Sequence, residues 1–228
     1  MGKLTLVGTP IGNLGDLSPR AKEALSEAEL WIVEDTRVSG RLQSHLGLKV
    51  PMKVLNEHTQ PHQADRLFKE ALTKQCCLLT DAGMPAISDP GAELVDFYRN
   101  HSGEVDAIPG PSAVTTALAL SGFYAQRYCF LGFLPRKHGP MLEILKPFAD
   151  STFTVVLFES PNRLLSLLGV VHEAMGERRY AICREISKLH QQVFREKLPT
   201  IPTEETVPLR GEFTIVVEGL RRRERQLG

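Results

Sequence analysis

The sequence is poor in cysteine, and none of its cysteines has a partner at a recognisable spacing. The four are Cys76, Cys77, Cys129 and Cys183, and each lies in an apolar stretch typical of a strand. There is no Cys-x-x-Cys motif, and the seven histidines complete no metal-ligand pattern. We therefore expect buried, reduced thiols and no metal site.

Long hydrophobic runs are also absent. No apolar segment approaches the roughly 18 residues that cross a bilayer. The N-terminal residues lead directly into a strand and lack the features of a signal peptide. These absences predict a cytoplasmic protein that does not associate with membranes.

Excess charge of either sign is lacking over the whole chain, which has 27 Lys+Arg and 27 Asp+Glu. A dedicated nucleic-acid binder is usually basic. The two halves differ, however: residues 1–120 carry 11 basic and 15 acidic residues, a net charge of −4, whereas residues 121–228 carry 16 and 12, a net charge of +4. This distribution favours the C-terminal half as the surface that meets a polyanion.

The first half of the chain alternates strands with helices. Ser18 is a predicted N-cap and Pro19 the first residue of a helix. Short apolar runs predict strands at 4–7, 30–33, 76–80 and 105–108, and apolar residues at helical spacing predict helices beginning at Pro19 and at 64–72, 92–98 and 111–120. Strands separated by helices form parallel sheets through right-handed crossovers, so we predict a mostly parallel sheet.

The second half has fewer helices between its strands, which predicts a mixed sheet. Its expected strands are 128–131, 152–158, 180–183, 191–194 and 213–217, with a helix that ends near Met175. The boundary between two α/β domains is expected near residues 121–127, giving domains 1–121 and 122–228. The charged tail at 221–225 is expected to be frayed.

Loops rich in glycine and proline follow the strands of the first half. They occupy residues 8–14, 81–91 and 109–113, and residues 34–37 follow the second strand. Ligands of open α/β sheets bind beyond the carboxyl ends of the strands, and glycine lets the main chain approach a ligand closely. Neither a P-loop nor a GxGxxG motif is present. We therefore predict a ligand bound mainly through main-chain groups, with no special provision for a nucleotide phosphate.

Acidic residues accompany these loops. Asp81 and Asp89 flank one loop and could divide acid and base roles, bind a metal, or cap turns and helices. Asp35 and Arg37 lie side by side after the second strand and could form an internal ion pair. No Ser/His/Asp arrangement supports covalent catalysis by a hydroxyl.

An ordered series of motifs makes the chain recognisable from about residue 4 to 219. They are TPIGNL (9–14), EDTR (34–37), DAGMPAISDPG (81–91), IPGPSA (108–113), FLGFLP (130–135), FESPNR (158–163) and REISK (184–188), followed by GE (211–212) and VEG (217–219). With these motifs the sequence resembles the tetrapyrrole methylase superfamily and, within it, the branch that methylates a cytidine ribose 2′-hydroxyl of 16S ribosomal RNA. It departs from longer members in lacking a helical region after VEG and in its proline-rich segment 198–210.

The resemblance implies two α/β domains with S-adenosyl-L-methionine in the cleft between them, no metal, and a homodimer. It implies that the substrate is 16S ribosomal RNA within the small ribosomal subunit. The cofactor residues that it implies are Pro10, Gly83, Met84, Pro85, Ile87, Ser88, Asp89, Ser112, Ala113, Phe158, Glu159 and Ser160.

In-line methyl transfer to a ribose hydroxyl depends on positioning and on a base that removes the hydroxyl proton. The candidate bases are Glu159, Asp35 and a Lys188 of lowered pKa, and the sequence does not rank them. Arg184 and Lys188 belong to the catalytic set, and basic residues that could hold RNA phosphates are Arg136, Lys137, Arg163, Arg184 and Lys188. Two alternatives remain: a methylase of a tetrapyrrole or of a modified histidine, and an inactive nucleotide- or RNA-binding module.

Overall fold

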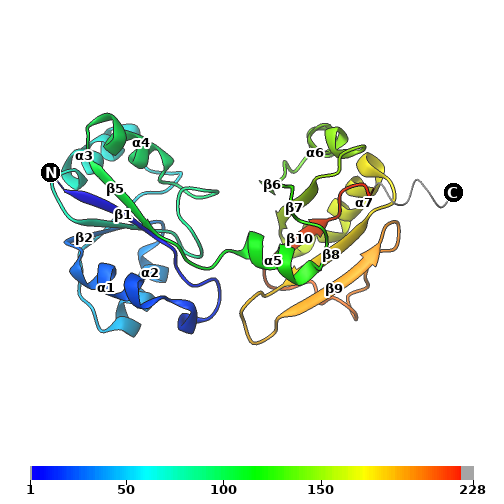
Figure 1. Cartoon of the computed structure of the whole chain (residues 1–228), viewed down its shortest axis with the longest axis horizontal. Helices are drawn as coiled ribbons and strands as arrows, with labels where there is room; N and C mark the ends of the chain where they lie inside the picture. Colours follow the sequence, from blue (N-terminus) through cyan, green and yellow to red (C-terminus); the bar gives the residue numbers. More distant parts are fainter. Residues whose placement is uncertain (1, 222–228) are drawn as a thin grey trace. The chain divides into compact units, whose positions relative to one another are not determined.

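The structure, a computed structural model, describes residues 2–221 (Figure 1). The chain divides into two compact units, Met1–Ser112 and Ala113–Gly228. The dividing point precedes helix α5 (Ala113–Ser121), on the N-terminal side of the expected boundary, because α5 packs on strands of the second unit. Most of the tail expected to be frayed lies outside the described residues.

The first unit is built on an all-parallel, five-stranded sheet with strand order β3-β2-β4-β1-β5, as predicted for this half. Its strands are β1 (Lys3–Val7), β2 (Leu30–Val33), β3 (Met52–Val54), β4 (Cys76–Leu79) and β5 (Glu104–Ile108). Its helices are η1 (Leu14–Asp16), α1 (Pro19–Glu27), α2 (Thr36–Leu46), α3 (Pro61–Ala71) and α4 (Ala92–Asn100).

Both faces of this sheet are covered, and strands β2 and β4 are accordingly apolar and buried along their whole length. Side chains alternate between faces along a strand: Ile32 joins a core under α3 and α4, and Trp31 joins a core under α1 and α2 (Figure 1). Helix α1 begins as predicted, with the Ser18 hydroxyl accepting a hydrogen bond from the Ala21 N–H at 3.1 Å. Burial raises the pKa of the Cys77 thiol to about 12, so it stays protonated at neutral pH.

The second unit holds a mixed sheet with strand order β6-β7-β10-β8-β9, in which only β6 and β7 run parallel. Its strands are β6 (Tyr128–Phe133), β7 (Thr154–Glu159), β8 (Arg179–Arg184), β9 (Gln192–Lys197) and β10 (Phe213–Val217). Its other helices are α6 (His138–Leu145), η2 (Lys146–Phe148), η3 (Pro161–Arg163) and α7 (Leu164–Met175). The mixed sheet confirms the prediction for this half.

Each sheet gathers the candidate residues at one edge. In the first unit all strands are parallel, so the loops after β1, β2, β4 and β5 lie at the same edge. In the second unit Phe213, at the start of β10, pairs with both Glu159 and Arg184, which end β7 and β8. No helix within residues 2–221 is long and apolar enough to cross a bilayer.

Candidate functional site

Main-chain hydrogen bonds and a close contact join the loops after β1, β4 and β5 at the carboxyl edge of the first sheet. The Thr9 N–H donates to the Gly83 carbonyl at 2.8 Å, and the Gly83 N–H donates back to the Thr9 carbonyl at 3.1 Å. The Gly8 N–H donates to the Ile108 carbonyl at 3.0 Å. A Cβ on Gly8 would lie only 2.5 Å from the Gly110 nitrogen, so this close approach requires glycine. The loops after β1, β4 and β5 therefore form one rigid main-chain surface.

The loops after β1 and β4 contain seven of the predicted cofactor residues. Gly83 has a φ of +87° and turns the chain out of β4. Pro85 is buried and braces the loop, Met84 and Asp89 are half-buried, and Ile87 and Ser88 are exposed. Pro10 is half-buried in the adjoining loop. Ser112 and Ala113 lie at the junction of the two units, at the start of α5.

An acidic group lies at the ends of β2 and β4. Glu34 Oε2 accepts hydrogen bonds from the Thr80 hydroxyl at 2.8 Å and the Asp81 N–H at 3.3 Å. Asp81 Oδ1 is buried and has no hydrogen-bond partner among the described residues. Burial, reinforced by the negative charge of Glu34, raises the pKa of Asp81 to about 6, and burial raises the pKa of Asp89 as well. Asp81 is thus an ionisable acceptor with unused capacity.

Asp35 forms an ion pair with Arg37, one of the possibilities that the sequence allowed. Its carboxylate caps α2 by accepting from the Arg37 N–H at 2.7 Å, and it meets the Arg37 guanidinium at 2.5 Å. The hydrogen bonds from Arg37 lower the pKa of Asp35 to about 2. A carboxylate with so low a pKa is a weak base, so the geometry disfavours Asp35 in that role.

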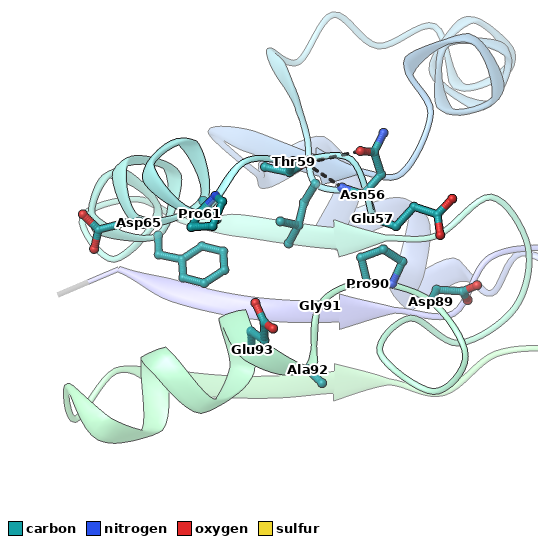
Figure 2. Close-up of a pocket in the computed structure, with 13 residues that line it drawn as sticks. Asn56, Glu57, Thr59, Pro61, Asp65, Asp89, Pro90, Gly91, Ala92 and Glu93 are labelled. Carbon is teal, nitrogen blue, oxygen red and sulfur yellow. Dashed lines mark hydrogen bonds between the residues drawn. The ribbon is translucent and has the colours of Figure 1, made fainter.

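A cavity of about 730 Å³ opens beside the acidic group (Figure 2). One side is formed by the loop after β3 and the start of α3, and the other by the end of the 81–91 loop and the start of α4. Its acidic and amide lining residues are Asn56, Glu57, Asp65, Asp89 and Glu93, and apolar walls come from Leu55, Pro61, Phe68 and Pro90. The Asn56 amide reaches the Glu34 carbonyl at 3.5 Å and so connects the cavity to the acidic group.

Of the residues predicted for the site, Asp89 lines this cavity. Asn56 and Glu57 were missed because β3, which precedes them, has only three residues and no buried one. The available signal was a polar Asn-Glu pair directly after the apolar Val54-Leu55 pair.

Glu159 lies at the end of β7 in the second unit and is buried. Its Oε1 accepts from the Ser160 N–H at 2.7 Å, and its Oε2 lies 3.1 Å from the Arg163 guanidinium, outside hydrogen-bond alignment. Arg163 also donates to the Leu134 carbonyl at 3.0 Å. Glu159 and Arg163 therefore fix the segment after β6 to the end of β7.

Phe158, the neighbouring predicted cofactor residue, belongs to an aromatic group. Its ring centroid lies 4.9 Å from that of Phe130 and 5.6 Å from that of Phe133. Ser160 begins the short helix η3.

Arg184 and Lys188 are both engaged within the fold. The buried Arg184 donates to the Arg210 carbonyl at 2.7 Å and to the His190 carbonyl at 3.2 Å. Lys188 Nζ contacts Glu185 at 2.9 Å and Glu212 at 3.0 Å. Burial by itself would lower the pKa of Lys188, but hydrogen bonds to these two carboxylates outweigh it and raise the pKa. The lowered pKa that a neutral amine base needs is therefore not found.

The chain is similar to a described protein family and to named methyltransferases over nearly its whole length. Residues 3–202 match the family model described as Tetrapyrrole (Corrin/Porphyrin) Methylases. The chain is 43% identical to Ribosomal RNA small subunit methyltransferase I of Thermotoga maritima, over 96% of this chain and 99% of the relative. It is 40% identical to the protein of the same name from Synechocystis sp., over 96% of this chain and 80% of the relative.

Solved structures share the fold. The crystal structure of diphthine synthase superposes with a TM-score of 0.73 at 17% identity, covering 99% of this chain and 94% of that one. The methyltransferase CobJ superposes with a TM-score of 0.70 at 17% identity, covering 97% of both chains. The family model and the relatives together identify the chain as a member of the tetrapyrrole methylase family, methyltransferases that take their methyl group from S-adenosyl-L-methionine.

Proposed function

We propose that the protein transfers a methyl group from S-adenosyl-L-methionine to the ribose 2′-hydroxyl of a cytidine in 16S ribosomal RNA. The observation that carries the proposal is the 36–43% identity, over nearly the whole chain, to proteins named Ribosomal RNA small subunit methyltransferase I. The net charge of +4 in residues 121–228 is compatible with an RNA substrate. Because these relatives are named as ribosomal RNA methyltransferases, they argue against a tetrapyrrole or a modified histidine as the methyl acceptor.

The first unit has groups that fit the cofactor. Gly8 and Gly110 bring two loops into main-chain contact, and Gly83 turns a third loop beside them. The orphaned Asp81 Oδ1 can accept a hydrogen bond from a ligand N–H or O–H group. When bound, S-adenosyl-L-methionine supplies an electrophilic methyl group on a sulfonium. Residues 83–89 hold the cofactor through the main chain, and Asp81 offers a carboxylate to it or to the incoming ribose.

Asp81 is the best-supported base. Asp35 is neutralised by Arg37, and Lys188 is held as a cation by Glu185 and Glu212. Asp81, by contrast, keeps a free buried oxygen and a pKa of about 6, close to the operating pH at which a general base is effective. Asp81 would take the proton of the ribose hydroxyl, and Glu159 would keep a positioning role at the end of β7.

The partners follow from the same proposal. RNA phosphates meet the second unit, where the exposed Arg136 and Lys137 side chains make no hydrogen bond or ion pair with residues 2–221. The proposed active form is a cytoplasmic homodimer that acts on the small ribosomal subunit. Sedimentation at micromolar concentration tests the dimer, because a species of only 25.3 kDa would exclude it.

The decisive experiment uses purified protein, labelled S-adenosyl-L-methionine and small ribosomal subunits from cells that lack the activity. Nucleoside mass spectrometry of the treated 16S RNA should detect 2′-O-methylcytidine, and naked 16S RNA provides the comparison substrate. A methyl group on a base, or none on RNA together with transfer to a tetrapyrrole, would reject the proposed substrate while leaving the family unchanged.

A further inference from the structure

A β-bulge in β6 changes the direction of one phenylalanine. The pairing of β6 with β7 is irregular between Phe130 and Gly132, and Gly132 has a φ of +62°. Residues three apart in a regular strand point to opposite faces of the sheet. The extra residue instead brings Phe130 opposite Val156 and Phe133 opposite Phe158, so both phenylalanines share one face. Bulges of this kind commonly re-aim a side chain beside a functional site.

Phe133 is supported from one side and open on the other. Its ring packs against Phe158, which in turn packs against Phe130, while 64% of Phe133 remains exposed. The backbone that carries it is fixed, since Arg163 donates to the carbonyls of Leu134 and Pro135. The result is an aromatic ring on a fixed main chain, packed against Phe158 and otherwise largely exposed, at the carboxyl end of β6.

Two exposed cations follow within four residues of this ring. The side chains of Arg136 and Lys137 have no hydrogen-bond or ion-pair partner in the described part of the chain. A fixed, exposed aromatic ring beside unpaired cations is the combination with which proteins hold single-stranded nucleic acid, with a base on the ring and phosphates on the cations. Double-stranded RNA is instead recognised mainly by its shape and backbone, without need of an exposed ring.

We propose that Phe133 is the stacking platform for an unpaired base of the RNA substrate, with Arg136 and Lys137 holding the adjacent phosphates. This inference rests on the proposed function, because it takes RNA as the substrate. Phe133 is a positioning residue that holds the RNA strand without taking part in methyl transfer.

The test measures the binding of a fluorescently labelled, single-stranded fragment of 16S RNA to the full chain. Phe133→Ala should weaken binding about 5- to 150-fold, the effect of losing one base–aromatic stack, and Phe133→Trp should restore it. The matched control is Phe153→Ala, since Phe153 is 41% exposed but precedes β7 at the opposite edge of the same sheet. That control should bind RNA as the wild type does.

The salt dependence of RNA binding distinguishes base stacking on Phe133 from phosphate contacts with Arg136 and Lys137. Phe133→Ala should leave the slope of log affinity against log salt unchanged, whereas Arg136→Gln and Lys137→Gln should each reduce that slope by about 0.7, as expected for the loss of one contact to a single strand. A slope that falls in Phe133→Ala would show that the ring acts only by positioning cations, and would overturn the stacking role.

The outcomes also separate this inference from the proposed function. A wild-type protein that neither binds nor methylates RNA would reject the proposed function. A wild-type protein that methylates RNA, with Phe133→Ala equal to it in binding and transfer, would reject the stacking platform alone. If Phe133→Ala converts a dimer to a monomer without weakening RNA binding per chain, the ring holds a second copy of the chain and the inference is wrong.

Discussion

Asp81 and Glu34 are two carboxylates that the ends of β4 and β2 bring close together, and the Glu34 carboxylate accepts a hydrogen bond from the Asp81 main-chain N–H at 3.3 Å. Their mutual repulsion adds to the burial of Asp81, and together they move the pKa of Asp81 to about 6. The sequence places the two residues far apart, so neither the orphaned oxygen nor the raised pKa could be predicted from it.

Glu34→Gln should shift the pH profile of methyl transfer to lower pH. Removing the Glu34 charge stabilises ionised Asp81, lowers its pKa, and lets it act as a base under more acidic conditions. The wild-type rate should fall as the pH drops through about 6, whereas the variant should keep its rate to lower pH. The measurement is kcat/KM for RNA between pH 4.5 and 8.5.

Glu93→Gln is the control for this prediction, because Glu93 is another cavity carboxylate but is not among the charges that raise the pKa of Asp81. Its profile should follow that of the wild type. An unchanged acidic limb in Glu34→Gln, or full activity in Asp81→Asn, would exclude Asp81 as the base.

Gly83→Val should weaken S-adenosyl-L-methionine binding at least tenfold without unfolding the protein. Within the protein, a Cβ on Gly83 would have only ordinary contacts, 3.6 Å from Ile11 and from the Pro111 carbonyl. The cost arises from the φ of +87°, which a β-branched residue adopts poorly and which would strain the Thr9–Gly83 hydrogen bonds.

Calorimetry measures the loss of affinity, and circular dichroism checks the fold. Gly139→Ala is the matched control, because Gly139 lies in α6 without a positive φ and has no atom within 4 Å of an added Cβ. Normal cofactor binding by folded Gly83→Val would reduce Gly83 to a simple turn residue.

Helices and strands were predictable where a single local signal dominates. Strands β2 and β4 are continuous apolar runs buried on both faces. The start of α1 is indicated by the N-cap Ser18 followed by Pro19 in the first turn. Besides the short 3-10 helices η1, η2 and η3, three elements were missed. Strand β3 is short and half-exposed, the apolar pattern of α2 is broken by Gly40, and α6 contains Gly139 and Pro140 in its first turn. Asp35 and Arg37 were recognisable as a pair because they are neighbours, whereas the Lys188–Glu212 contact is formed only by folding.

Substitutions of Arg184, which ends β8, and of Lys188, which follows it, should distinguish a structural role from a functional one. Arg184→Ala removes a buried guanidinium that donates to the carbonyls of Arg210 and His190, and a hydrogen bond made by a charged group contributes about 1.5–3 kcal/mol. At about 2–4 °C per kcal/mol for a chain of this size, its melting temperature should fall by several degrees. Lys188→Met removes only partly exposed ion pairs, worth about 0–1 kcal/mol.

Lys188 is also one of the basic residues that could hold RNA phosphates. Methyl transfer should therefore fall sharply in Lys188→Met, while S-adenosyl-L-methionine binding stays near the wild-type value. Thermal unfolding, cofactor calorimetry and the RNA transfer assay, run on both variants, provide the comparison. Wild-type transfer by Lys188→Met would confine Lys188 to holding Glu185 and Glu212 together.

Charge is divided between the two compact units although the whole chain is neutral. All the charged residues of positions 1–120 lie within Met1–Ser112, so the first unit carries −4 and the second +4. A neutral protein has no long-range attraction for RNA as a whole, and contact must come from an oriented basic surface. Shape and an assembled particle are then expected to contribute the rest of the affinity.

RNA binding and cofactor binding should therefore respond differently to salt. RNA binding should weaken steadily between 50 and 300 mM salt, because each phosphate contact releases counterions on binding. We propose that S-adenosyl-L-methionine is held mainly by main-chain groups of the first unit, so it should bind with nearly constant affinity across the same range and in the presence of a chelator. Titrations of both ligands with the full chain in one buffer series make the comparison. RNA affinity that does not change with salt would place the RNA contact away from the basic unit. Cofactor binding that a chelator abolishes would require a metal site, which the spacing of the cysteines and histidines does not predict.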